Sequence, residues 1–339
     1  MIDVAQRANV STATVSRVLN NSSRVSAKTK QKVLQAIDEL NYIPNASAKS
    51  LRSQKTRTIA VVVSDIHSSY FAEIVKGIEN MANSRKYRIV ICDTQNEREK
   101  EVEMMSLAMD RTVDAMVFVA PIISNDEIKA FVDRGYTVGI IGRHIEHPSI
   151  PCAYTDNVKI SQEVIAHLLD KGHSRIAFLS GYADSTDSYE RLEGYMKALT
   201  FAQLPYDQEL VENGQFNENG GYEAFRRLWF KSLDITAIFA ANDEMALGVY
   251  RACRELGITI PEQLTVIGVD NNRVAKYITP KLSTVEQPKY AMGALLVEKL
   301  IDQMNDNDFI DQRVFKVDSK LIIRESSSIS IDRTGSVST

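Results

Sequence analysis

The chain has 339 residues, of which 44% are hydrophobic and 25% charged, with a formal net charge of −4. This composition is typical of a globular protein and excludes collagen-like, intrinsically disordered and membrane-spanning chains. The length suggests about two domains, the three distant cysteines form neither a disulfide framework nor a CxxC metal motif, and without a signal-peptide pattern we expect a cytoplasmic protein.

The charge is distributed unevenly along the chain. Residues 1–58 contain ten Lys or Arg and three Asp or Glu, so they carry +7, which leaves −11 on the remainder of a chain with net charge −4. A basic segment joined to an acidic body indicates a polyanion-binding module attached to a part that does not bind the polyanion. A solvated helical face would give the same charge pattern.

Three short helices are predicted in the first forty residues. Apolar residues recur at helical spacing over 3–9, over 12–20 and from 27 to about 40, and Ser11 is a good N-cap for the second helix. Two short helices joined by a tight turn are typical of the helix-turn-helix motif. The residues expected in this small core are Val4, Ala5, Ala8, Val15, Val18, Leu19, Val33, Leu34, Ile37 and Leu40.

The second helix has small residues in its first turn, which permits close approach to base edges in the major groove. Arg17 can donate two hydrogen bonds to guanine. We therefore predict that this helix reads DNA sequence. The residues expected to contact DNA in the head, residues 1–45, are Thr12, Ala13, Thr14, Ser16, Arg17, Asn20, Ser26 and Asn45.

Residues 46–57 are predicted to be a hinge segment. Pro44 disfavours helix at the residue before it, and 46–52 is too short to form a stable helix alone. Small residues allow the segment to lie in a narrow groove, and Leu51 has no local core to join. We predict that Leu51 is a wedge between base steps, with Ala48 and Arg52 as neighbouring DNA contacts. A plain linker is the alternative.

From Thr58 onward, apolar runs alternate with helical patterns, which predicts parallel α/β sheets. The runs are 58–65, 88–92, 115–119, 138–141, 176–179, 237–240 and 264–269. The pattern restarts near Ser174, so we expect two lobes with a ligand cleft beyond the carboxyl ends of their strands. The expected boundaries are about 58–156 plus 288–314 for lobe 1, about 157–287 plus 315–326 for lobe 2, and 327–339 for a flexible tail.

Several candidate ligand-binding side chains follow these runs. Aromatic faces together with an arginine, an amide and a carboxylate match a polyhydroxylated ligand. The aromatic residues could equally belong to the lobe cores. The candidates are Tyr70, Phe71, Arg191, Phe216, Asn242 and Asp270, with Arg143, after the strand that ends at Ile141, as a further one.

The sequence resembles the lactose/galactose-repressor family of bacterial regulators. The resemblance covers the head, the hinge and the first core strand, and continues through the motifs DIHSSYFA (65–72), YTDN (154–157), RLEG (191–194), ANDEMALG (241–248), IGVDN (267–271) and TVEQP (284–288). Family members usually have a few residues before the equivalent of Asp3, so we expect either an upstream start or a first helix without a side-chain cap.

The resemblance implies a helix-turn-helix head, a hinge helix and a two-lobed core of parallel sheets like that of periplasmic binding proteins. It places Thr12, Ala13, Ser16 and Arg17 at recognition-helix positions and makes Leu51 the hinge leucine. It adds Asp156 and Gln287 to the effector cleft. It further implies a homodimeric repressor on a pseudo-palindromic operator, controlled by a small sugar or phosphosugar rather than a purine.

Other functions are less well supported by the sequence. It contains no phosphate-binding loop, dinucleotide fingerprint or nucleophile elbow, so we expect no enzyme and no cofactor. His144 and His147 have no third ligand nearby, so we expect no metal. A sugar-binding transport protein would share the core but not the basic head. Control by a phosphorylated carrier protein of the sugar phosphotransferase system stays open, because DIHSSYFAEI and DEMALGV resemble regulators of that type.

Overall fold

The computed structural model describes residues 1–19, 24–42, 55–231, 233–305, 313–331 and 337–338. The chain divides into two compact units, a head within Met1–Thr56 and a core within Arg57–Thr339. Among the helices described, none is long and apolar enough to span a lipid bilayer.

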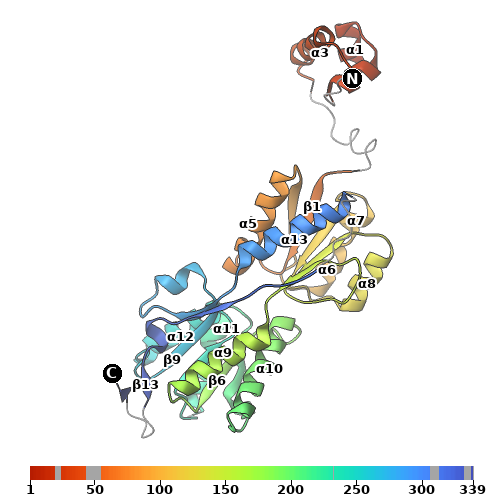
Figure 1. The fold of residues 1–339 in the computed structure, drawn as a ribbon. Coiled ribbons are helices and arrows are strands. Elements are labelled where there is room, and N and C mark those ends of the chain that lie inside the picture. The colour runs from red at the N-terminus through yellow and green to blue at the C-terminus, as the bar shows by residue number, and fades with distance from the viewer. Residues whose placement is uncertain (20–23, 43–54, 232, 306–312, 332–336, 339) are drawn as a thin grey trace. The chain divides into compact units, whose positions relative to one another are not determined.

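Three helices form the head: α1 (Ile2–Ala8), α2 (Thr12–Leu19) and α3 (Ala27–Glu39) (Figure 1). Helix α1 has no side-chain cap at Met1, whereas the Ser26 hydroxyl accepts a hydrogen bond from the Thr29 N–H and caps α3. The buried core confirms most of the prediction and consists of Val4, Ala5, Ala8, Val15, Val18, Val33 and Ala36.

The prediction that Leu34 and Leu40 belong to the core of the head is wrong. Leu34 and Leu40 are 45% and 42% exposed. Leu34 lies about 100° around the helix from Val33, so Ala36 takes the inward position instead. Leu40 lies at the C-cap of α3, where the helical spacing that would turn it inward has ended.

The first lobe of the core is built on a six-stranded sheet with the order β11-β5-β4-β3-β1-β2, in which every pair is parallel. Alternate residues of β1 pack on opposite faces, which explains why this strand is apolar throughout. The strands are β1 (Thr58–Val63), β2 (Arg88–Asp93), β3 (Ala115–Val119), β4 (Val138–Ile141), β5 (Cys152–Tyr154) and β11 (Val314–Lys316). The helices are α5 (Ser69–Ser84), α6 (Arg98–Met104), α7 (Ser106–Met109), α8 (Asn125–Asp133) and α13 (Lys289–Met304).

The second lobe has a sheet of the same size with the order β12-β10-β9-β8-β6-β7, parallel except for the edge strand β12. Its strands are β6 (Ile176–Ser180), β7 (Val211–Asn213), β8 (Ala237–Ala240), β9 (Thr265–Asp270), β10 (Ser283–Glu286) and β12 (Lys320–Ile322). Its helices are α9 (Asn157–Asp170), α10 (Thr186–Phe201), α11 (Glu218–Phe230) and α12 (Asp243–Leu256), with short 3₁₀ turns η1 (Gln208–Leu210), η2 (Arg273–Lys276) and η3 (Glu325–Ser327).

The chain crosses between the two sheets three times, after β5, after β10 and after β11. The predicted α/β class with two parallel-sheet lobes is confirmed. The last crossing follows Lys316, because β11 pairs with β5 in the first sheet. The expected boundary at residue 314 therefore assigned two residues of β11 to the other lobe.

The expectation that the segment after residue 326 is a flexible tail is wrong at its beginning. Ser327 is buried, and its hydroxyl donates to Ser283 Oγ at 2.7 Å. The preceding Ser326 hydroxyl donates to the carbonyl of Val266 at 2.6 Å. Strand β13 (Ser330–Ile331) then pairs with β14 (Val337–Ser338). Serine-rich composition suggested disorder, but these hydroxyls are hydrogen-bond partners for buried groups of the second sheet.

Helix α13 packs closely on α5, although the two are far apart in sequence (Figure 1). A Cβ on Gly77 would lie 2.1 Å from the carbonyl oxygen of Tyr290, and a Cβ on Gly293 would lie 2.3 Å from that of Ile74. Only glycine permits this approach at both positions, so α13 is an integral part of the first lobe although it follows the second lobe in sequence.

Candidate functional site

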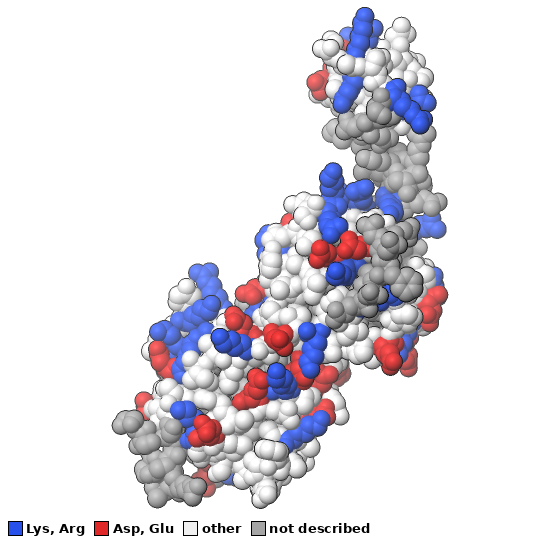
Figure 2. All heavy atoms as spheres, in the orientation of Figure 1, with Lys and Arg blue, Asp and Glu red and all other residues white. Residues whose placement is uncertain are grey.

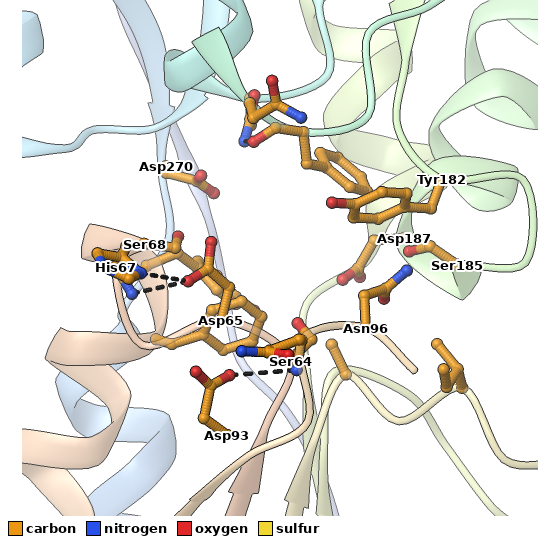
Figure 3. A pocket seen from close by; sticks show the side chains of 18 of the residues that line it. Ser64, Asp65, His67, Ser68, Asp93, Asn96, Tyr182, Ser185, Asp187 and Asp270 are labelled. Atoms are coloured by element: carbon orange, nitrogen blue, oxygen red, sulfur yellow. Dashed lines mark hydrogen bonds and ion pairs between the residues drawn. The ribbon is translucent and has the colours of Figure 1, made fainter. Parts of the chain in front are cut away.

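A cavity of about 310 Å³ lies in the core at the carboxyl ends of strands from both sheets (Figure 3). From the first lobe it is lined by residues after β1, β2 and β3, and from the second lobe by residues after β6, β7, β8 and β9. This is where parallel α/β sheets bind ligands. Six of the nine predicted cleft residues line it: Tyr70, Phe71, Arg191, Phe216, Asn242 and Asp270.

Arg191, on α10, is 3% exposed and is held by protein acceptors. Its Nε donates to Asn157 Oδ1 at 2.9 Å, and its guanidinium also donates to the carbonyl of Ala241. The guanidinium carbon lies 6.0 Å from the centroid of the Phe216 ring. These contacts fix the cation beside the cavity rather than leaving it mobile.

Asp270, the last residue of β9, is 3% exposed. Burial raises the pKa of its carboxyl to about 6, although the positive charges of Arg191 and Lys289 act in the opposite direction. Gln287 does not line the cavity; it donates to this carboxylate instead. A carboxyl group with a perturbed pKa at a cavity wall is typical of a functional site.

Backbone conformation also distinguishes this cavity. Five of its non-glycine lining residues have positive φ: Gln95 (55°), Asn96 (56°), Ala120 (50°), Phe216 (54°) and Asp270 (113°). Such conformations cost of order 1–3 kcal/mol each and cluster at binding sites, where the surrounding structure enforces them. The strained backbone therefore marks the same site as the side chains.

Two predicted cleft residues point elsewhere. The Asp156 carboxylate caps α9 by accepting from the Lys159 N–H at 2.9 Å, and it pairs with Lys316. Arg143 donates to the carbonyls of Pro121 and Ile123, and at 3.5 Å to Thr186 Oγ1 on the second lobe. Neither lines the cavity, because both side chains are engaged by nearby loops and helix ends.

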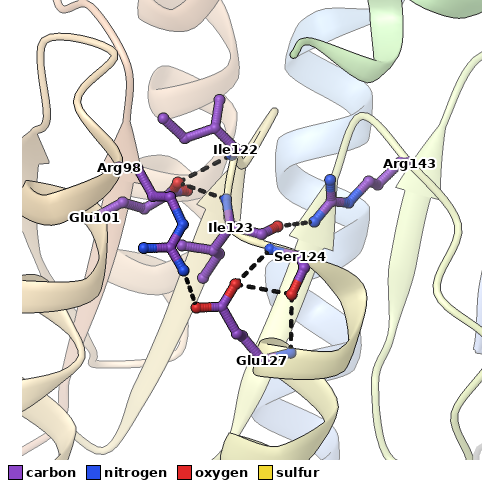
Figure 4. A network of polar contacts seen from close by, with 7 residues as sticks. All are labelled: Arg98, Glu101, Ile122, Ile123, Ser124, Glu127 and Arg143. Carbon is purple, nitrogen blue, oxygen red and sulfur yellow. Dashed lines mark hydrogen bonds and ion pairs between the residues drawn. The ribbon is translucent and has the colours of Figure 1, made fainter.

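Arg143 belongs to a polar network that holds the loop after β3 (Figure 4). The buried Glu101 carboxylate accepts from the N–H groups of Ile122 and Ile123 at 2.9 and 3.0 Å. Ser124 and Glu127 form a capping box at the start of α8, and Arg98 pairs with Glu127. Since Ala120 and Ile122 line the cavity, this network positions one of its walls.

Sequence reasoning missed much of the polar lining. The unpredicted lining residues include Asp65, Asp93, Gln95, Asn96, Tyr182, Asp187 and Asn217. The signal was available for Asp65, Asp93 and Tyr182, because each lies at or shortly after the carboxyl end of a predicted apolar run. For the others the fold was needed to bring the loops together.

The head presents the predicted recognition residues on one helix. Thr12, Ala13 and Arg17 are exposed on α2, while Thr14 and Ser16 are half-buried. Lys and Arg predominate over Asp and Glu on the head face seen in Figure 2. Ser26 is occupied as the cap of α3. The remaining predicted DNA contacts lie outside the described residues: Asn20, Asn45, Ala48, Leu51 and Arg52.

Within the described part of the chain, no group of three metal-binding side chains occurs. The two histidines of the HxxH pair have separate environments. His144 stacks on Tyr154 with ring centroids 6.0 Å apart, and His147 Nε2 lies 3.1 Å from Asp133 Oδ1.

A helix-turn-helix head joined to a two-lobed α/β core with a cavity defines the class of ligand-controlled DNA-binding regulators. Comparison with known proteins agrees. Residues 1–45 match the family described as bacterial regulatory proteins, lacI family, and residues 165–327 match the periplasmic binding protein-like domain. The chain belongs to the LacI family of transcription regulators; it is a DNA-binding regulator and not an enzyme.

Similar proteins align over nearly the whole chain. Catabolite control protein A of Priestia megaterium is 33% identical over 326 residues, which cover 96% of this chain and 98% of that protein. The HTH-type transcriptional regulator AscG of Escherichia coli (strain K12) is 34% identical, covering 96% and 97%. The lac repressor dimer bound to operator and the anti-inducer ONPF matches with a TM-score of 0.85 and 27% identity, and the CelR–cellobiose complex with 0.73 and 30%; each match covers 96% of this chain and 98% of the other.

Proposed function

We propose that this regulator is a homodimeric repressor of carbohydrate-utilisation genes, acting in the cytoplasm, whose operator binding is controlled by a small sugar in the cavity of the core. The observation that carries the proposal is the lining: aromatic rings, an amide, carboxylates and a fixed guanidinium converge from both lobes. These groups supply stacking surfaces together with hydrogen-bond donors and acceptors for hydroxyl groups.

The size of the cavity and the relatives support a sugar. About 310 Å³ is at the lower end of the range for small-molecule sites. Among similar structures, CelR is a complex with cellobiose, and a LacI-family regulator from Enterococcus faecium, 28% identical, contains ribose. A ligand held by residues of both lobes favours one arrangement of the lobes over others. If operator DNA favours one arrangement as well, ligand and operator change each other's affinity by the same factor.

On the DNA side, two heads would occupy successive major-groove half-sites of a pseudo-palindromic operator. The exposed positions of Thr12, Ala13 and Arg17 on α2 support this arrangement. The hinge segment with Leu51 would enter the minor groove between the half-sites, where the bend it introduces permits further contacts.

The test is operator binding by the full chain, measured by fluorescence anisotropy with and without members of a sugar panel. Arg191→Ala should abolish the response to sugar while leaving operator affinity unchanged, because this side chain is buried beside the cavity in the core. Arg134→Ala, an exposed arginine of the first lobe, is the control. An intact response in Arg191→Ala contradicts the assignment of the cavity.

The same assay separates the alternative functions. If a phosphorylated carrier protein changes operator affinity and no sugar does, control lies with the carrier protein. A sugar-binding transport protein would show no preference for any promoter fragment over bulk DNA, and the match of residues 1–45 to the lacI family favours the regulator.

A further inference from the structure

The cavity is lined by more negative than positive groups. Among the described residues, four carboxylates line it, Asp65 and Asp93 from the first lobe and Asp187 and Asp270 from the second, against a single cation, Arg191 (Figure 3). With His67 neutral, the lining carries a formal charge of −3, four negative charges less one positive. The charge sign of a site is a physical constraint on its ligand.

Among the described residues, the cation of the lining, Arg191, already makes hydrogen bonds to the protein. Arg191 donates to Asn157 and to the Ala241 carbonyl. Its charge also acts on Asp270, where it opposes the rise in the pKa of that carboxyl. A phosphate entering the cavity would meet four carboxylates and one guanidinium, two of whose donors are already bonded to Asn157 and Ala241, so its desolvation would be poorly offset.

The charge of Asp65 in the first lobe acts on titratable groups of the second lobe. After burial, the charge of Asp65 raises the pKa of Tyr182, which belongs to the opposite lobe. Asp65 also helps to raise the pKa of Glu244, at the start of α12, behind the contributions of burial and Glu218. Within the second lobe, Asp187 adds to the raised pKa of Asp270. Like charges at such positions repel, so closing the cleft on a neutral ligand brings unfavourable pairs closer.

Aromatic rings from both lobes provide an independent observation. Tyr70 and Phe71 form an edge-on pair in the first lobe with centroids 5.2 Å apart, and Tyr182 and Phe216 form one in the second with centroids 6.0 Å apart. All four line the cavity. Ring faces attract cations, and carboxylates accept hydrogen bonds from ammonium groups. Carboxylates and aromatic faces together are complementary to a protonated amine on a sugar ring.

We propose that the effector is a sugar bearing a protonated amino group, an inference that rests on the proposed function of the same cavity. The positive charge offsets the repulsion between carboxylates of the two lobes, so binding favours the closed cleft. Phosphorylated sugars, which the sequence left open, are rejected by the same charges.

The experiment compares ligands that share one ring and differ in charge. Glucose, glucosamine and glucose 6-phosphate, and the corresponding galactose series, are titrated into the full chain by calorimetry at low ionic strength and at about 0.5 M salt. We expect the amino sugar of the accepted series to bind about tenfold or more tightly than its neutral counterpart, and the phosphate to bind weakest. The preference should shrink in high salt, which screens charges near the cavity mouth.

Charge-removing variants localise the effect. Asp65→Asn and Asp93→Asn keep the side-chain shape, and each should lower the affinity for the amino sugar about threefold to tenfold more than it lowers the affinity for the neutral sugar. Asp110→Asn, an exposed site at the end of α7, changes the net charge equally and is the control. Equal reductions in all three variants would contradict a local effect.

The remaining outcomes distinguish the two levels of the proposal. If the neutral sugar binds as tightly as the amino sugar, or the phosphate binds tightest, the charge inference is overturned and the sugar-controlled regulator stands. If no member of either series binds while operator binding is intact, the proposed function fails and the inference fails with it.

Discussion

Gln287 donates its side-chain amide to Asp270 Oδ1 at 2.8 Å. Asp270 is part of the cavity wall, whereas Gln287 lies on the connection by which the chain leaves the second sheet after β10. The side-chain oxygen of Gln287, Oε1, accepts a hydrogen bond from Thr155 Oγ1 at 2.8 Å. Thr155 lies on the first connection between the lobes, directly after β5. One buried side chain thus joins the cavity to two of the three crossings.

Gln287→Ala should uncouple the cavity from these crossings. The substitution removes the hydrogen bonds of the Gln287 side chain to Asp270 and Thr155. We therefore expect effector affinity to fall about tenfold and the effect of ligand on operator affinity to shrink. Operator affinity without ligand should be unchanged. Calorimetry and anisotropy measure the two quantities, with Gln208→Ala, at an exposed position, as the control. Unchanged ligand affinity would show that the bond is dispensable.

Asp270→Asn should stabilise the protein in a pH-dependent way. The pKa of this carboxyl is raised to about 6 in the folded state, above its usual 3.8, so between about pH 4 and pH 6 the unfolded chain binds fewer protons than the folded one. The contribution of Asp270 to the free energy of unfolding therefore falls as pH rises through this window. At pH 8 we expect the Asn variant to be about 1–3 kcal/mol more stable, and at pH 4 no more stable, in urea denaturation.

The same variant should bind ligand more weakly, because Asn removes the carboxylate from the cavity wall. Higher stability with lower affinity is the usual exchange at a functional site. A stability gain that is equal at pH 4 and pH 8 would mean that burial of the charge is not its cause.

Glu101→Ala should destabilise the first lobe by about 2–4 kcal/mol, because it leaves the N–H groups of half-buried Ile122 and buried Ile123 without their acceptor. Glu101→Gln retains an acceptor oxygen and should cost much less. Thermal unfolding compares the two variants. Ligand affinity should fall in the Ala variant as well, since the loop it frees lines the cavity; equal stability of both variants would contradict this role.

Arg17→Ala should reduce the preference for the operator over bulk DNA by about 1–3 kcal/mol, the usual contribution of an arginine that reads guanine. Lys32→Ala on α3 removes the same charge from an exposed position of the head and is the control. Anisotropy titrations with both DNAs give the preference. Equal losses on operator and bulk DNA would assign Arg17 to a phosphate contact instead.

The sequence predicted the buried strands well, because a strand covered on both faces is a continuous apolar run, as 58–63 and 115–119 are. It did not predict β5, β7, β10, β11 or β12, each of which has only three or four residues. Three of them, β7, β11 and β12, contain no fully buried residue and give no periodic signal.

Side-chain direction explains most errors at the site. Asp270 and Arg191 line the cavity as expected, because the strand and the helix that carry them fix where they point. Arg143 and Asp156 follow strands of the first sheet, as cavity residues do, but their side chains bind other groups. Arg143 donates to a loop carbonyl, and Asp156 caps the N-terminus of α9. Gln95 and Asn96 were missed because a polar residue in a loop after a strand looks the same in sequence whether it meets solvent or lines a cavity.

The three crossings have a consequence for synthesis on the ribosome. Apart from its edge strand β12 and the turn η3 that follows, the second lobe is one continuous stretch, residues 157–286, whereas the first needs α13 and β11 to cover and complete its sheet. The first lobe therefore begins to emerge before the second but is completed after most of the second has been made. A chain that terminates early, before residue 289, would expose the apolar residues that α13 covers, and we expect it to be a target for chaperones and proteases rather than an unregulated repressor.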